Sequence, residues 1–129
     1  MGTGLLICAN LAASGTSGTL NPTLKLIMSD EPLDGSDTKH VLVGMATFPE
    51  NSTTQRHSHA GDEFATVTSG AMEITNDGES SHIYRAGESY HNRRGVIHVA
   101  KNVSDGPSVV NFVMIIDKGA PPQVPAPDK

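Results

Sequence analysis

The chain has 129 residues and a net charge of −5, which fits a single domain with its own core and argues against non-specific binding to nucleic acid or anionic membranes. No apolar run reaches the ~20 residues that a membrane-spanning helix needs. The single cysteine, Cys8, excludes an intramolecular disulfide and a cysteine-based zinc site. Because no basic residue precedes the apolar residues 4–13, as a secretory signal would require, we expect a cytoplasmic protein.

Thirteen glycines and eight prolines favour turns over long helices. Residues 1–23 form an expected N-terminal arm that could add an edge strand, and the proline-rich residues 118–129 are expected to lie extended on the surface. Between them, strands are predicted over residues 23–28, 40–48, 63–68, 71–75, 81–85, 89–91, 97–103 and 108–116. With turn residues between these strands and no helical period, the chain is predicted to be an all-β protein, an antiparallel sandwich or barrel spanning residues 24–117.

The first candidate site lies in residues 57–70. His57 and His59 are separated by one residue, so on a strand their rings would point to the same face. Gly61 lets the backbone turn before Glu63, and the two imidazoles and the carboxylate could then converge on one metal ion. A His-x-His pair by itself is weak evidence, since such pairs also occur in solvated loops. A further ligand is therefore needed from elsewhere in the chain.

Residues 87–102 supply this further ligand. Gly87 and Gly95 bracket a turn, and His98 lies on the strand that follows. Three nitrogen ligands and one oxygen ligand suit iron(II), manganese, nickel, copper or zinc, and the donor set does not choose among them. An ion held by four protein ligands keeps an open position only if it is five- or six-coordinate, and this separates a working centre from a closed structural one.

These two segments resemble the two motifs of the cupin superfamily. The first motif is His-x-His, three or four residues, Glu, six residues and Gly, and it is matched by His57, His59, Glu63 and Gly70. The second is Gly, five residues, Pro-x-Gly, two residues, His, three residues and Asn, and it is matched by Gly87, Gly95, His98 and Asn102. Arg93 replaces the proline, and Asn51 stands where a glycine often precedes the first motif. Both are turn positions, so we expect altered loops rather than altered ligation.

The resemblance implies a single-domain jelly-roll β-barrel with one divalent transition-metal ion near an open end. It implies that the motif glycines Gly70, Gly87 and Gly95 are turn residues and that Asn102 is structural. Small cupins commonly pair through their sheets, so a homodimer is expected. Carried over position by position, the implied metal ligands are His57, His59, Glu63 and His98.

No Ser/His/Asp arrangement or phosphate-binding loop is evident, so any chemistry is expected to come from the metal, with Glu63 as a candidate base. Cupins that this chain resembles include dioxygenases as well as lyases, isomerases and cyclases. We predict a metal-dependent enzyme for a small-molecule substrate, with dioxygenase-type oxidoreductase chemistry favoured by family frequency. The alternatives are a non-redox metal-dependent lyase, isomerase or cyclase, and a non-catalytic ligand-binding barrel. Candidate substrate-binding residues are Arg93, His91 and Tyr90.

Overall fold

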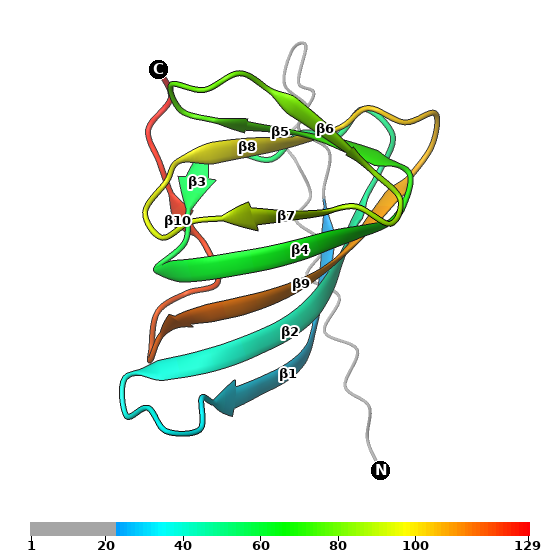
Figure 1. The fold of residues 1–129 in the computed structure, drawn as a ribbon. Helices are drawn as coiled ribbons and strands as arrows, with labels where there is room; N and C mark the ends of the chain where they lie inside the picture. The colour runs from blue at the N-terminus through cyan, green and yellow to red at the C-terminus, as the bar shows by residue number, and fades with distance from the viewer. Residues whose placement is uncertain (1–22) are drawn as a thin grey trace.

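The computed structural model describes residues 23–129, so the expected N-terminal arm, apart from Thr23, and Cys8 lie outside the described residues. The described chain is built from strands alone (Figure 1), and it contains no helix of the length and hydrophobicity that a membrane crossing requires. The strands are β1 (Leu24–Pro32), β2 (Lys39–Phe48), β3 (His57–Ser58), β4 (Gly61–Ser69), β5 (Ala71–Asn76), β6 (His82–Arg85), β7 (Ser89–Asn92), β8 (His98–Asn102), β9 (Ser108–Asp117) and β10 (Val124–Pro125).

These strands form two five-stranded sheets, with the strand orders β1-β2-β9-β4-β7 and β10-β3-β8-β5-β6. Every strand pair is antiparallel, and distant segments such as β2 and β9 lie side by side, as they do in a jelly roll. The all-β, antiparallel prediction is confirmed. The hydrogen-bonded ladders of the described residues form two facing sheets rather than one continuous closed barrel.

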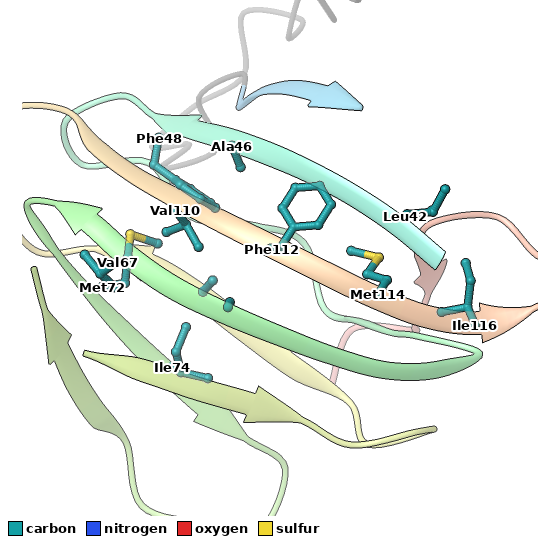
Figure 2. Packing of buried hydrophobic residues seen from close by; sticks show 12 residues of the cluster. Leu42, Ala46, Phe48, Val67, Met72, Ile74, Val110, Phe112, Met114 and Ile116 are labelled. Carbon is teal, nitrogen blue, oxygen red and sulfur yellow. The ribbon is translucent and has the colours of Figure 1, made fainter. Parts of the chain in front are cut away.

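The core lies between the two sheets and follows the alternation of each strand. In β9 the even-numbered residues are buried and their neighbours are less so. Figure 2 shows four of these side chains extending from β9 among those of neighbouring strands. Burial of each large apolar side chain stabilises the fold by roughly 1.5–3 kcal/mol. The buried core residues from β9 are Val110, Phe112, Met114 and Ile116, and the opposing sheet contributes Met72, Ile74 and Ala100 to the core.

Two motif residues that were expected to be structural hold the loops at one end of the sheets. Gly70 has φ +80°, and a Cβ there would lie 2.1 Å from Ser108 Oγ, so a larger residue would be both strained and crowded. The buried amide of Asn102 donates hydrogen bonds to the carbonyl oxygens of Phe48 and Gly106, at 3.0 and 2.8 Å. It thereby ties together the loops that follow β2 and β8.

The C-terminal segment is paired rather than simply laid on the surface. Val124 pairs with Ser58 and Pro125 pairs with His57, so β10 forms the edge of the second sheet beside β3. Figure 1 shows this segment, in red, running along β3. The proline content gave no indication that this segment borders the first candidate site.

Candidate metal centre

Two neighbouring segments bring the three predicted histidines together. His57 lies on β3 directly opposite His98 on β8, and His59 follows two residues after His57. The ring centroids of His57 and His98 are 4.3 Å apart, and each lies 5.1 Å from that of His59. All three rings are buried. The predicted convergence of the two motifs on one point is therefore present in the fold.

The outward nitrogen of each ring contacts a backbone carbonyl. The Nδ1 atoms of His57 and His59 lie 2.7 Å from the carbonyl oxygens of Gln55 and Pro122, and His98 Nδ1 lies 3.1 Å from that of Val96. A carbonyl oxygen only accepts hydrogen bonds, so each Nδ1 carries the proton. In a neutral ring this leaves the Nε2 lone pair free, which is the arrangement that metal-binding histidines use.

Burial favours the neutral form of two of these rings, His57 and His98. Burial, together with the neighbouring His98 ring, lowers the pKa of His57 to about 4 against the opposing hydrogen bond to Gln55. Burial also lowers the pKa of His98, although its hydrogen bond to Val96 acts in the other direction. At neutral pH both rings are therefore in the form that coordinates a metal ion.

Glu63 brings a negative charge to the same place from β4. Its Oε1 lies 3.4 Å from His59 Nε2 and accepts a 2.7 Å hydrogen bond from the Asn92 amide. Burial alone would raise the pKa of Glu63, but its interactions with His59 and Asn92 outweigh that effect and lower the pKa to about 2. The carboxylate is therefore ionised throughout the physiological range.

These residues fit a divalent cation. One nitrogen from each of His57, His59 and His98 lies within 4.8 Å of the other two. His59 Nε2 is buried and has no hydrogen-bond partner among the described residues, an arrangement that is costly unless something else satisfies the nitrogen. Three imidazole nitrogens beside an ionised carboxylate supply the donor set that such an ion needs, so the three histidines are positioned to bind a metal.

A small cavity adjoins this cluster. Its volume is about 30 Å³, which is enough to hold a water molecule. Its walls are largely apolar and include Phe48 and Phe112, while Lys25 and Tyr90 bring polar groups to it. The candidate ligands also line this cavity, so a small molecule bound in it would lie beside them.

The three candidate substrate-binding residues occupy different places. Tyr90, on β7, lines the cavity, and burial and the charge of Glu63 raise the pKa of its phenol. His91 instead stacks on the exposed Phe64 ring and pairs with Asp62 through a 2.8 Å contact, on the outer face of the sheet. Arg93 is exposed in the turn after β7 and is not among the residues that line the cavity.

Three features of the site were not found from the sequence. Asn92 pairs with Glu63 across β4 and β7, and the alternation of β7 could have indicated this, because an inward Tyr90 also turns Asn92 inward. Lys25 lies on the edge strand β1 opposite the buried Ala46, which places both side chains on the inner face. The Pro122 carbonyl comes from a segment 63 residues beyond His59, and no sequence pattern indicated that contact.

The family assignment follows from the sequence itself. The model of the cupin domain family matches residues 44–116, which is more than half of the chain and includes both motif segments. This protein is a cupin. No curated protein matches the sequence.

Solved cupin-like structures agree with the fold. The polyketide cyclase RemF from Streptomyces resistomycificus matches with a TM-score of 0.64 and 20% identity, over 83% of this cupin and 72% of that chain. A cupin-like protein from Thermotoga maritima matches with a TM-score of 0.64 and 18% identity, over 81% of this cupin and 75% of that chain. An oxalate oxidase in complex with the substrate analogue glycolate matches with a TM-score of 0.53 and 23% identity, over 57% of this cupin and 41% of that chain. At these identities the likeness concerns the fold.

Proposed function

We propose that this cupin is a metal-dependent enzyme that acts on a small organic substrate at a centre formed by His57, His59, Glu63 and His98. The observation that supports this most strongly is the set of three buried rings whose Nδ1 protons are all held by backbone carbonyls. This arrangement leaves the Nε2 atom of each ring free of the backbone, and one nitrogen from each histidine lies within 4.8 Å of the other two. A purely structural cluster would be expected to pair these nitrogens with hydrogen-bond donors.

The roles of the residues follow from their surroundings. The three histidines and Glu63 would hold the ion, which supplies Lewis acidity toward a carbonyl or enolate oxygen and, if it is redox-active, oxygen chemistry. A carboxylate with a pKa of about 2 is a poor general base near neutral pH, so its surroundings favour Glu63 as a ligand over Glu63 as a base.

Tyr90 is the group best placed to contact the substrate. Its raised pKa keeps the phenol protonated, so its hydroxyl could donate a hydrogen bond to a substrate oxygen. The neighbouring Phe48 and Phe112 make part of the cavity wall apolar, and a hydrogen bond or charge beside apolar groups acts more strongly than in water. These features support an enzyme more than a binding module that exchanges freely with solvent.

Dioxygenase-type chemistry is the form of the reaction that we propose first. A non-redox reaction is the second candidate, because the structures with similar folds include a polyketide cyclase as well as an oxalate oxidase. The donor set is compatible with both, since the same ligands bind redox-active and redox-inactive ions.

Oxygen consumption separates the two candidates. Protein loaded with iron, copper or nickel is expected to consume oxygen with at least one flavonol, β-diketone or catechol substrate, and His98→Ala is expected to abolish this activity. A His82→Ala variant, changed at an exposed ring on β6, serves as the control and should keep the activity. Absence of oxygen uptake with all three metals would contradict the dioxygenase proposal and favour the non-redox candidate.

A further inference from the structure

Lys25 is the one lysine or arginine among the described residues that line the cavity beside the three histidines. It lies on β1 opposite Ala46, and both residues line this cavity. Although the residue as a whole is exposed, burial of its ammonium group lowers its pKa, and the negative charge of Glu63 opposes that shift. The Lys25 ammonium group therefore lies at the edge of a largely apolar cavity, where it interacts electrostatically with Glu63.

The Lys25 ammonium donates a hydrogen bond to the side-chain oxygen of Gln123. Gln123 lies in the C-terminal segment, between the carbonyl of Pro122 that holds His59 and strand β10. This contact joins the edge of the first sheet to the edge of the second sheet beside the metal centre. The amide oxygen of Gln123 is a neutral acceptor, and an anionic oxygen would form a stronger, charge-assisted bond with the same ammonium group.

We propose that Lys25 binds the carboxylate of a small anionic substrate, which displaces Gln123 and places its other end toward the metal centre. The inference deepens the proposed function and rests on it. Two observations support it: the position of Lys25 in the wall of the cavity that the three histidines also line, and its exchangeable neutral partner Gln123.

The test uses formate and formamide, which have the same number of heavy atoms and differ in charge. Each is titrated into Co²⁺-loaded protein, and binding is followed by isothermal titration calorimetry, which detects binding at Lys25 whether or not the probe contacts the ion. The Lys25→Met variant is expected to bind formate about tenfold more weakly than wild type, with formamide affinity unchanged within twofold. A Lys101→Met variant, changed at an exposed lysine on β8, should bind both probes as wild type does.

Two variants of Gln123 provide an independent test. Gln123→Glu places a permanent carboxylate beside Lys25 and is expected to weaken formate binding as strongly as Lys25→Met does. Gln123→Ala removes the competing oxygen and is expected to bind formate at least as tightly as wild type. These substitutions leave the ammonium group in place, so they report on competition for it.

The Co²⁺ affinity of each variant, measured by competition with a chelator, separates the inference from the proposed function. Lys25→Met is expected to keep the wild-type Co²⁺ affinity, because Lys25 is not a proposed ligand. If Lys25→Met takes up Co²⁺ normally and binds formate as wild type does, the inference on Lys25 is overturned and the metal centre stands. If wild-type protein takes up no Co²⁺, both proposals are overturned.

Discussion

At Glu63, burial and hydrogen bonding act in opposite directions on the same carboxylate. Burial disfavours the charged form, whereas the contacts with His59 and Asn92 favour it strongly enough to lower the pKa to about 2. Asn92 is a neutral donor opposite Glu63 in the ladder of β4 and β7, and its amide binds one carboxylate oxygen at 2.7 Å. It therefore orients the carboxylate without adding a positive charge that would repel a metal ion.

Replacement of Asn92 by alanine is expected to weaken metal binding about 10- to 100-fold, because hydrogen bonds that orient a ligand contribute to affinity by that order. Competition with a chelating dye measures the change. Asn111→Ala, at an exposed position on β9, is the matched control and should bind metal as wild type does. Unchanged affinity in Asn92→Ala would contradict the role assigned to Asn92.

Among the elements, the short strands β3 and β10 show how the second sheet positions a ligand. The Pro122 carbonyl, just before β10, accepts the Nδ1 proton of His59, and Ala126 donates a 2.9 Å backbone hydrogen bond to the Arg56 carbonyl. Arg56 in turn donates a 2.9 Å hydrogen bond to the carbonyl of Pro127. The C-terminal segment is thus fixed on both sides of β10 and holds one histidine in its metal-binding tautomer.

Truncation after Lys118 is expected to weaken metal binding by about tenfold or more, since it removes the acceptor that fixes His59. Truncation after Ala126 keeps Pro122 and β10, and it is expected to leave the affinity within about threefold of wild type. Isothermal titration with Zn²⁺ measures both. Equal affinities for the two truncated proteins would show that the segment does not support His59.

At the scale of the whole molecule, the fold was largely predictable because short β-rich runs are separated by turn residues at regular spacing. The sequence of β9 is apolar on both faces, so it predicted a strand there without indicating that the even-numbered residues face the core. The three histidines were also predictable, since His57 and His59 lie in one motif and His98 in the other, each with its own glycines.

The remaining parts of the site depend on contacts between distant residues. Strands β3 and β10 have two residues each, too few to show any alternation, so their pairing could not be read from the sequence. Lys25 lies on an edge strand, where its inward direction depends on its register with β2. The expected homodimer stays a prediction, and a sedimentation mass near the 13.5 kDa of one chain would contradict it.

The metal content of the purified protein tests the central claim most directly. Protein isolated without added metal and analysed by mass spectrometry is expected to contain about one transition-metal ion per chain. His57→Ala and His98→Ala are expected to contain less than about a tenth of that amount, because each loses one of three converging nitrogens, while His82→Ala keeps the wild-type content. Wild-type metal content in His57→Ala and His98→Ala would contradict the assignment of this centre.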